Sequence, residues 1–161
     1  MKPIKFNISK LRIEISSDLY QKLSSLQNKT CDKEKGGVLM GELRPSRNQI
    51  TITHILESEM HLSSSHNINL NVKYLQKKMN DIWEKNHGTI TYLGDWHSHP
   101  ENNPSPSIID YCTFIKNFYT SHFDHNILIY LILGNKSIWS RAFNGSSFYK
   151  FTLIINKKYN K

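Results

Sequence analysis

The 161-residue sequence has few cysteines and no long hydrophobic run. Its two cysteines, Cys31 and Cys112, are far apart and form no Cys-x-x-Cys pair, which argues against a disulfide framework and fits a reducing cytosol. The longest apolar run, residues 127–133, is too short to cross a bilayer, and the N-terminus lacks the apolar core of a signal peptide. We therefore expect a soluble, cytoplasmic protein without membrane contact.

Acidic residues are also scarce, because 13 Asp and Glu face 21 Lys and Arg, which gives a formal charge of +8. Such an excess can indicate nucleic-acid binding when the basic residues cluster. Here the lysines are scattered, with a small excess at the two ends of the chain and no stripe interleaved with aromatics. We expect a solvated basic surface rather than a nucleic-acid site, and an acidic protein partner is equally compatible with the charge.

Internal repeats and low-complexity linkers are absent, and the length suits one domain over residues 1–161, with a core from about 11 to 155 and a short basic tail. Hydrophobic periodicity predicts alternating strands and helices. Strands are expected at residues 11–15, 36–43, 49–56, 89–93 leading to His97, 126–133, 138–143 and 148–155. Helices are expected from Ser16 or Ser17 to about 28, at 70–86 and at 107–121. This order indicates an α/β or α+β domain with helices on opposite sides of a sheet.

Two histidines follow one of these strands, in the sequence His97-Ser98-His99-Pro100. In an extended chain, residues two apart project from the same face, so the two imidazoles should converge. A proline-containing loop then leads to a helix that opens at Ser107, with Asp110 one turn further on. Two imidazoles and a carboxylate make a three-ligand zinc set with a fourth position for water, as in catalytic sites.

The motif is specific only as a whole. With eight histidines in the chain, about 0.4 His-x-His pairs are expected by chance, but requiring Pro, Ser and Asp at the observed offsets lowers the expectation below roughly one in ten thousand. In a simpler interpretation, Ser107 and Asp110 only cap a helix and the histidines are ordinary strand residues. Capping and metal binding by Ser107 and Asp110 are compatible with each other.

Other candidate ligands are weaker. Cys112, His122 and His125 could suggest a second metal, but they lack recognised zinc spacing, and His54 fits a strand residue better than a ligand. We therefore expect one zinc ion per chain.

Amide hydrolysis at such a zinc site requires a proton acceptor near the water that does not itself bind the metal. Glu34 is the candidate, because it precedes a glycine-rich strand that can lie close to the strand of His97. The hydroxyl of Ser107 could stabilise the oxyanion of the tetrahedral intermediate.

These residues together resemble the complete signature of the JAB/MPN/JAMM zinc metallopeptidases. The pattern is E-x-G-G-x-L-x-G from Glu34, H-S-H-P from His97, six residues, and S-x-x-D from Ser107 to Asp110. The resemblance spans about residues 11 to 155 and implies a cytidine-deaminase-like α/β fold with a mixed sheet between helices. It also implies roles for five residues: His97, His99 and Asp110 as zinc ligands, Glu34 as the water-activating base and Ser107 as the transition-state stabiliser.

Residues 92–97 (YLGDWH), the Pro-Ser-Pro-Ser loop and the short chain resemble the small bacterial JAB isopeptidases of CBASS antiphage operons. That resemblance implies removal of a ubiquitin-like protein from a conjugated cyclic-oligonucleotide synthase, a nucleotidyltransferase, with a ubiquitin-like ligase system encoded nearby. The helix after Asp110 runs into Asn126 without room for a large ubiquitin-gripping insertion, which speaks against ubiquitin itself as the native substrate.

Two further interpretations stay open at this point. One is a JAB protease that processes sulfur-carrier proteins, and the other is a non-catalytic MPN scaffold. Scaffold members typically lack metal ligands, so the intact set here favours an enzyme. The identity of the cleaved protein, the oligomeric state and the substrate-gripping surface are not encoded in any recognisable motif.

Overall fold

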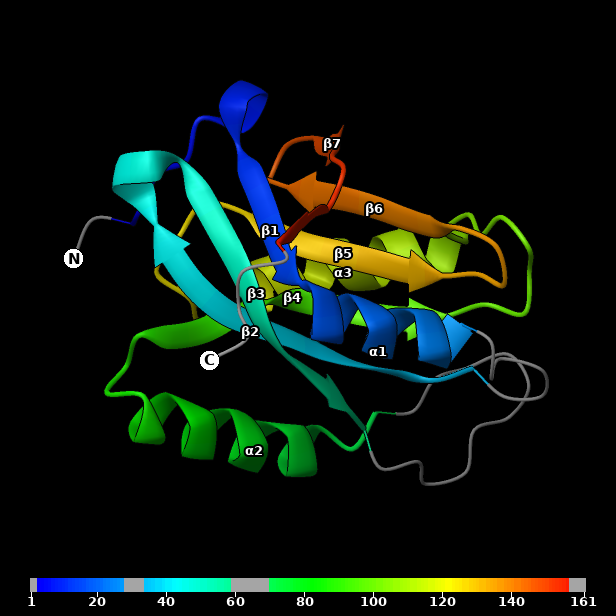
Figure 1. The fold of residues 1–161 in the computed structure, drawn as a ribbon, viewed down its shortest axis with the longest axis horizontal. Coiled ribbons are helices and arrows are strands. Elements are labelled where there is room, and N and C mark those ends of the chain that lie inside the picture. Colours follow the sequence, from blue (N-terminus) through cyan, green and yellow to red (C-terminus); the bar gives the residue numbers. More distant parts are fainter. Residues whose placement is uncertain (1–2, 28–33, 59–69, 157–161) are drawn as a thin grey trace.

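The computed structural model describes residues 3–27, 34–58 and 70–156. Within these ranges it contains an eight-stranded sheet and three α-helices (Figure 1). In chain order the elements are β1 (Arg12–Ser16), α1 (Ser17–Gln27), β2 (Gly36–Arg44), β3 (Gln49–Glu57), α2 (Val72–Lys85), β4 (Ile90–Ser98), α3 (Ile108–Thr120), β5 (Leu128–Leu133), β6 (Ile138–Phe143), β7 (Phe148–Lys150) and β8 (Ile154–Asn156).

The strand order is β7-β6-β5-β4-β2-β3-β1-β8, which makes β4 a central strand. It pairs antiparallel with β2 and parallel with β5. Parallel pairs also join β1 to β3 and β1 to β8, so the sheet is mixed. The predicted α/β class with a mixed sheet between helices is therefore confirmed.

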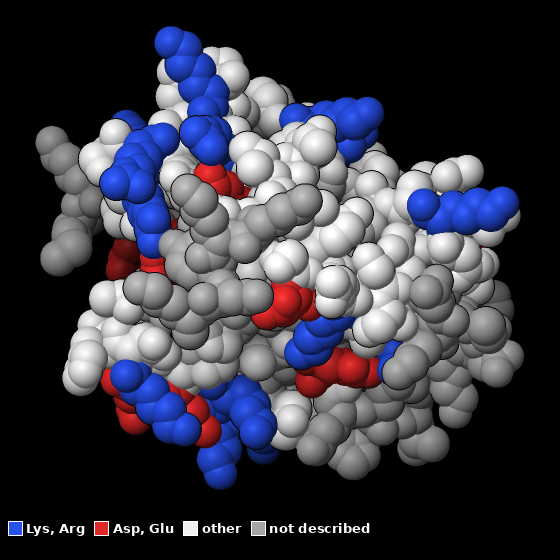
Figure 2. Space-filling view, viewed as in Figure 1, with Lys and Arg blue, Asp and Glu red and all other residues white. Residues whose placement is uncertain are grey.

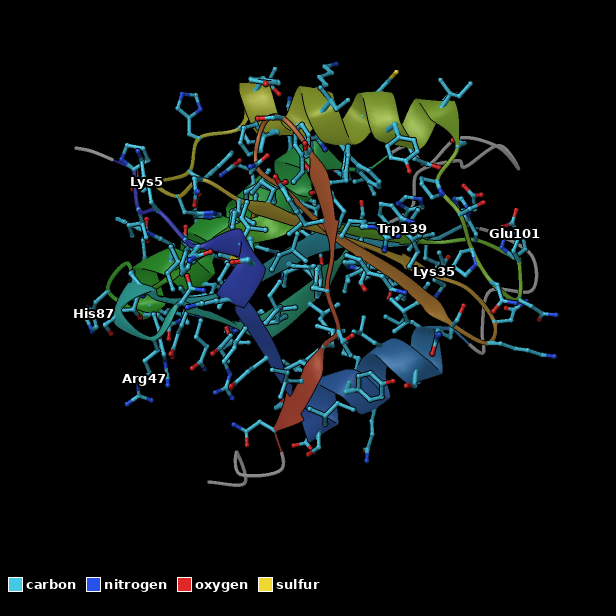
Figure 3. All side chains as sticks on the ribbon, turned by 90° about the horizontal axis from the view of Figure 1, so that it is seen from above. Lys5, Lys35, Arg47, His87, Glu101 and Trp139 are labelled. Atoms are coloured by element: carbon cyan, nitrogen blue, oxygen red, sulfur yellow. The ribbon has the colours of Figure 1, made fainter. Side chains whose placement is uncertain are left out.

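Helix α1 covers one face of the sheet, and α3 lies on the opposite face (Figures 1 and 3). Residues of β5 alternate between the two sides, since Ile129 and Leu131 belong to the core cluster under α1, whereas Tyr130 and Ile132 pack with Phe114 of α3. Because β5 is covered on both faces, its continuous apolar sequence has a physical reason.

Local signals for element ends are largely confirmed. The Ser16 hydroxyl accepts a hydrogen bond from the Leu19 backbone at 3.3 Å, which makes it the cap of α1. After α2, His87 and Gly88 take positive φ angles of 51° and 74°, a conformation that commonly ends a helix. The connection between β2 and β3 is a short 3-10 turn that ends at Asn48 in the left-handed conformation.

The prediction of one strand over residues 148–155 is wrong. The segment forms β7 and β8, which pair with β6 and β1 at opposite edges of the sheet. Between them, Phe151 and Leu153 pack against the core under α1, and the Ser140 hydroxyl donates to the Phe151 carbonyl at 2.7 Å. The residues between β7 and β8 are therefore apolar because they cross the core, and this made the segment look like one strand in the sequence.

The helix predicted at 70–86 is confirmed as α2, although only part of its apolar side is buried. Leu75 is buried, but the side chains of Val72 and Trp83 are 69% and 53% exposed. Helix α2 contacts β4, β2 and β3, and Val72 and Trp83 lie outside that contact.

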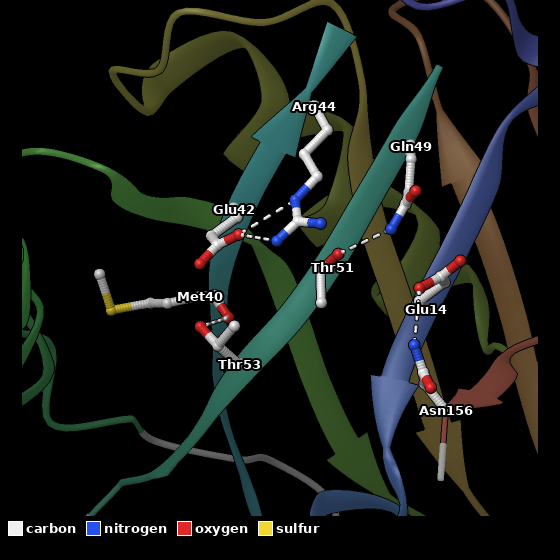
Figure 4. A network of polar contacts seen from close by, with 8 residues as sticks. All are labelled: Glu14, Met40, Glu42, Arg44, Gln49, Thr51, Thr53 and Asn156. Atoms are coloured by element: carbon white, nitrogen blue, oxygen red, sulfur yellow. Dashed lines mark hydrogen bonds and ion pairs between the residues drawn. The ribbon is translucent and has the colours of Figure 1, made fainter. Parts of the chain in front are cut away.

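Polar side chains of β1, β2, β3 and β8 form hydrogen-bonded pairs, two of them within one strand and one between β1 and β8 (Figure 4). The pairs are Arg44 with Glu42 at 2.7 Å, Gln49 with Thr51 at 3.2 Å and Asn156 with Glu14 at 3.4 Å. On the face shown in Figure 2, Lys and Arg form separate groups with Asp and Glu between them. Surface charge in this view is dispersed rather than gathered into one stripe.

The predictions for Cys31 and for the basic tail at 157–161 concern residues outside the described ranges, as does the segment 59–69. Cys112 is a free, exposed thiol. Among the helices of the described ranges, none has the length and apolar character needed to span a bilayer.

Candidate metal centre

The two histidines of the motif stand at the end of β4. His97 lies opposite Gly36 of β2 and Ile132 of β5, and the His99 backbone donates to the Leu133 carbonyl at 2.9 Å. Both side chains are largely buried, and their Nε2 atoms are 3.1 Å apart. The predicted convergence of the two imidazoles is therefore present, because the extended backbone continues through Ser98.

The loop from Pro100 to Ser107 is attached to the turn between β5 and β6. The Asn135 backbone donates to the Glu101 carbonyl at 2.7 Å, and the Lys136 backbone donates to the Asn102 carbonyl at 2.9 Å. At Gly134, an added Cβ atom would lie 2.3 Å from the Pro104 ring, so only glycine permits this approach. These contacts determine where α3 begins relative to the histidines.

Helix α3 begins with a capping box. The Ser107 hydroxyl oxygen accepts from the Asp110 backbone at 3.1 Å, and the Asp110 carboxylate accepts from the Ser107 backbone at 2.7 Å. The capping interpretation is thus confirmed. The same carboxylate faces the histidines, with Oδ1 at 3.3 Å from His97 Nε2 and Oδ2 at 3.5 Å from His99 Nε2.

The three donor groups fit a zinc ion. Their atoms lie within 4.8 Å of one another, and the closest separations are 3.1, 3.3 and 3.5 Å. Ligands about 2.0–2.1 Å from a tetrahedral zinc would lie roughly 3.3–3.4 Å apart, which matches these separations. Two imidazoles and one carboxylate also form a zinc set that leaves one position open.

The electrostatics of Asp110 favour its charged form. Burial opposes ionisation, but hydrogen bonding and charge from His97, together with hydrogen bonds from Ser107, hold the pKa of the Asp110 carboxyl well below its usual range. The carboxylate is therefore available as a ligand throughout the physiological pH range.

Glu34 comes two residues before β2, in a segment that the backbone ties to the strand of His97. The next residue, Lys35, exchanges two hydrogen bonds with Ser98, since the Ser98 backbone donates to the Lys35 carbonyl at 2.8 Å and the Lys35 backbone donates to the Ser98 hydroxyl at 2.9 Å. Gly36 then pairs with His97. Lys35 is labelled at the same end of the sheet as Glu101 in Figure 3. Lys35 thus bonds to Ser98, the residue between the two histidines, and Glu34 directly precedes Lys35.

The sequence did not predict a buried polar network around Asp95, two residues before His97 on β4. The Asp95 carboxylate accepts from the Tyr92 hydroxyl and from the Asn117 amide, both at 2.8 Å. Burial raises the pKa of Asp95, and the hydrogen bonds from Asn117 and Tyr92 oppose that rise. A register shift in the pairing of β4 with β2 places Tyr92 and Asp95, three residues apart, on the same face.

A groove of about 630 Å³ lies between α2 and α3 on the same side of the sheet. Its walls include Met40, Leu75 and Met79, and Asp95 and Asn117 contribute polar groups. Asp95 is two residues before His97 on the same strand. The lining of the groove reaches Asp95 on β4, and the three donor groups lie outside it.

The other candidate ligands do not join the centre. In the ranges 3–27, 34–58 and 70–156, His97, His99 and Asp110 make the one group of three suited to a metal. His125 Nε2 donates to the Tyr92 carbonyl at 2.9 Å, and His54 contacts the Thr53 hydroxyl within β3. These two histidines are strand and core residues in this fold, as predicted for His54.

Comparison with known proteins identifies similar chains. A family model described as prokaryotic homologs of the JAB domain matches residues 16–144. A protein of Escherichia coli called CD-NTase/cGAS isopeptidase is 35% identical over 129 residues, which cover 79% of each chain. A Vibrio cholerae protein of the same name is 31% identical over 112 residues, or 66% of this chain and 65% of that one.

Among solved structures, a Desulfitobacterium hafniense protein known from its solution structure superposes with a TM-score of 0.68. The alignment covers 92% of this chain and 95% of the other, at 17% sequence identity. This likeness shows a shared fold.

Proposed function

The chain belongs to the family of prokaryotic homologs of the JAB domain, and from this premise we propose that it is a zinc-dependent isopeptidase of bacterial antiphage (CBASS) defence. Its substrate is the amide bond after the C-terminus of a ubiquitin-like protein joined to a cyclic-oligonucleotide synthase. The name CD-NTase/cGAS isopeptidase, carried by relatives at 35% and 31% identity, supports this substrate. The proposal includes action in the cytoplasm by one domain over residues 1–161, with a ligase system encoded nearby.

The observation that carries the proposal is the spacing of His97, His99 and Asp110, which suits one zinc ion per chain. When bound there, zinc supplies Lewis acidity toward the scissile carbonyl and lowers the pKa of a water in the fourth position. The protein holds the donors in place through β4 and the capping box of α3.

Glu34 is proposed as the base that accepts a proton from the attacking water and then delivers it to the leaving amine. The backbone exchange between Lys35 and Ser98 supports this role, because it holds the segment of Glu34 against the strand of the two histidines. Glu34 is half-buried, which leaves its carboxylate partly open to substrate.

Ser107 is proposed to stabilise the negative charge that develops on the scissile carbonyl oxygen. Its hydroxyl oxygen already accepts from the Asp110 backbone, so its hydrogen remains available to donate. The residue is exposed at the start of α3, where a substrate carbonyl can approach.

The groove between α2 and α3, whose lining ends at Asp95 two residues before His97, offers space for an extended peptide. Such a peptide is the form in which a C-terminal tail presents its last residues. The apolar wall, with Leu75 and Met79, favours a tail that carries at least one apolar side chain.

The test uses a purified conjugate between a synthase and its ubiquitin-like protein, incubated with the wild-type chain, with Glu34→Gln and with His97→Ala. We expect complete cleavage by the wild type, loss of cleavage with chelator, and recovery on adding zinc. Glu34→Gln should lose turnover and keep zinc, whereas His97→Ala should lose both. Cleavage that persists after full zinc removal would overturn the mechanism.

The same assay separates the rival substrates. A C-terminal fusion of a sulfur-carrier protein, offered in parallel, should be cleaved much more slowly than the synthase conjugate. Faster cleavage of the sulfur-carrier fusion would indicate instead a protease of cofactor or cysteine biosynthesis. A protein without zinc and without turnover on either substrate would be a scaffold.

A further inference from the structure

Helix α3 is bonded to β4 at two places. At its first turn, Asp110 faces the imidazoles of His97 and His99. Two turns later, the Asn117 amide donates to the buried carboxylate of Asp95 at 2.8 Å. Residues seven apart lie on nearly the same side of a helix, so both contacts are made by one face of α3.

The spacing of the two contacts matches along both elements. From Asp110 to Asn117 the helix advances about 10 Å. From Asp95 to Ser98, which stands between the histidines, the strand advances about 10 Å. Helix and strand therefore run alongside each other in opposite directions, and a shift of α3 along β4 would disturb both contacts together.

The rest of the α3 interface is mainly aromatic. Phe114 stacks on Tyr130 with ring centroids 4.2 Å apart, and Phe118 contacts Phe143 edge to face at 5.1 Å. Stacked rings tolerate small translations, whereas a hydrogen bond to a buried carboxylate does not. The Tyr130 hydroxyl adds one bond to the Phe114 carbonyl, near the middle of the helix.

We propose that Asn117 is a positioning residue for the metal centre, and that its bond to Asp95 sets the place of α3 along β4 and thereby the distance of Asp110 from the two histidines. The inference rests on the proposed metal site, but it assigns a role to residues outside the ligand set. Tyr92 completes the arrangement, because its hydroxyl holds the second oxygen of Asp95.

The experiment measures affinity for zinc alone, by competition with a chromophoric chelator, and the absorption spectrum of the Co²⁺-loaded protein. Asn117→Leu should weaken zinc binding about tenfold, the lower end of the loss seen when groups bonded directly to metal ligands are removed, because Asn117 acts through the position of α3. It should also change the intensity of the Co²⁺ bands, which report ligand geometry. Asp95→Asn keeps an oxygen for Asn117 and should bind zinc within about threefold of the wild type.

Phe143→Leu is the matched control, because it loosens the aromatic packing under α3 without touching the bond to Asp95. At a similar loss of thermal stability, it should retain zinc affinity within about twofold and an unchanged Co²⁺ spectrum. Equal zinc affinity in Asn117→Leu, Phe143→Leu and the wild type would overturn the positioning role.

A second variant covers the case in which Asn117→Leu does not fold. Asp95→Leu combined with Asn117→Leu removes the buried charge together with its donor, which is less costly than leaving the carboxylate unpaired. The folded double variant should bind zinc as weakly as proposed for Asn117→Leu, and wild-type affinity in it would contradict the role. Absence of zinc binding in the wild type would instead remove the metal site itself.

Discussion

The two faces of the sheet differ in what they contain. Under α1, β4 contributes Leu93 and Trp96 to a large apolar cluster with Leu23 and Ile15. On the other face, β4 carries Asp95 and His97, and His99 follows its last residue, so the candidate donor groups lie beside a smaller aromatic cluster. The first face is mainly apolar packing with a few bonds to backbone carbonyls, such as that from Trp96 Nε1 to the Leu56 carbonyl at 3.0 Å. The second face adds hydrogen bonds to a buried carboxylate and the three candidate donor groups.

The comparison shows that one central strand can place core residues on one face of the sheet and candidate functional residues on the other. Because successive side chains of β4 point to opposite faces, the apolar side keeps the strand in place while the polar side presents donors. Ser98 is a polar exception in this alternation. Its hydroxyl accepts a hydrogen bond from the backbone of Lys35, the residue before β2. We therefore expect mutations on the two faces to have separable effects.

The largest effect on stability is expected from the α1 face. Leu23 is fully buried, so Leu23→Ala should lower the free energy of unfolding by about 2–5 kcal/mol through lost burial and a cavity. The turnover of the remaining folded protein should stay within about twofold. Denaturant unfolding and conjugate cleavage measure the two quantities, with the exposed position Gln21→Ala as control. A large loss of turnover in folded Leu23→Ala would break the separation of the faces.

At Gly134, which contacts the loop before Asp110, we expect the reverse: a small change in stability and a loss of turnover. In Gly134→Ala, the new Cβ would meet the Pro104 ring at 2.3 Å and the Glu101 carbonyl at 2.7 Å, so the loop must move. A displacement of about 1 Å at the centre can cost about a hundredfold in rate, and we expect a fall of about ten- to a hundredfold in turnover. Ser146→Ala, an exposed change in the next turn, should leave turnover unaltered. Wild-type turnover in Gly134→Ala would show that this loop does not position Asp110.

The smallest effect concerns a buried polar group that belongs to the fold rather than to the metal centre. Burial lowers the pKa of His125 below its ordinary value of 6.5, despite its bond to the Tyr92 carbonyl. Below about pH 6.5 the unfolded chain therefore binds more protons than the folded one. Stability contributed by neutral His125 is complete above that pH and declines as the pH falls toward the folded pKa, by at most about 1.4 kcal/mol per pH unit.

Unfolding titrations at pH 7, 6 and 5 test this expectation. His125→Gln keeps a donor for the Tyr92 carbonyl and should flatten the pH dependence, whereas exposed His122→Gln should not. His54, whose pKa is also lowered by burial, contributes in the same direction and remains in both variants. Identical slopes in His125→Gln and the wild type would exclude His125 as the source.

Much of the fold and of the ligand geometry could be predicted from local patterns. Alternation along β4 predicted that His97 and His99 would face the same way, and the helix start at Ser107 predicted the position of Asp110. Both are short-range properties of the chain. The roles of Glu34 and Ser107 in catalysis stay predictions, because they depend on substrate.

Other features depend on contacts between distant segments and could not be predicted. The pairing of Tyr92 with Asp95 requires a register shift in the sheet, which simple alternation does not contain. The need for glycine at position 134 arises from Pro104, thirty residues earlier in the chain. The division of residues 148–155 between two sheet edges likewise depends on the partner strands β6 and β1.

The central claim is that His97, His99 and Asp110 together hold one zinc ion. Metal analysis of the purified wild-type chain, of Glu34→Gln and of Asp110→Ala after dialysis against zinc-buffered solution tests it most directly. The account predicts one zinc per chain in the wild type and in Glu34→Gln, and little or none in Asp110→Ala. A wild-type chain without zinc, or an Asp110→Ala chain with a full complement, would contradict it.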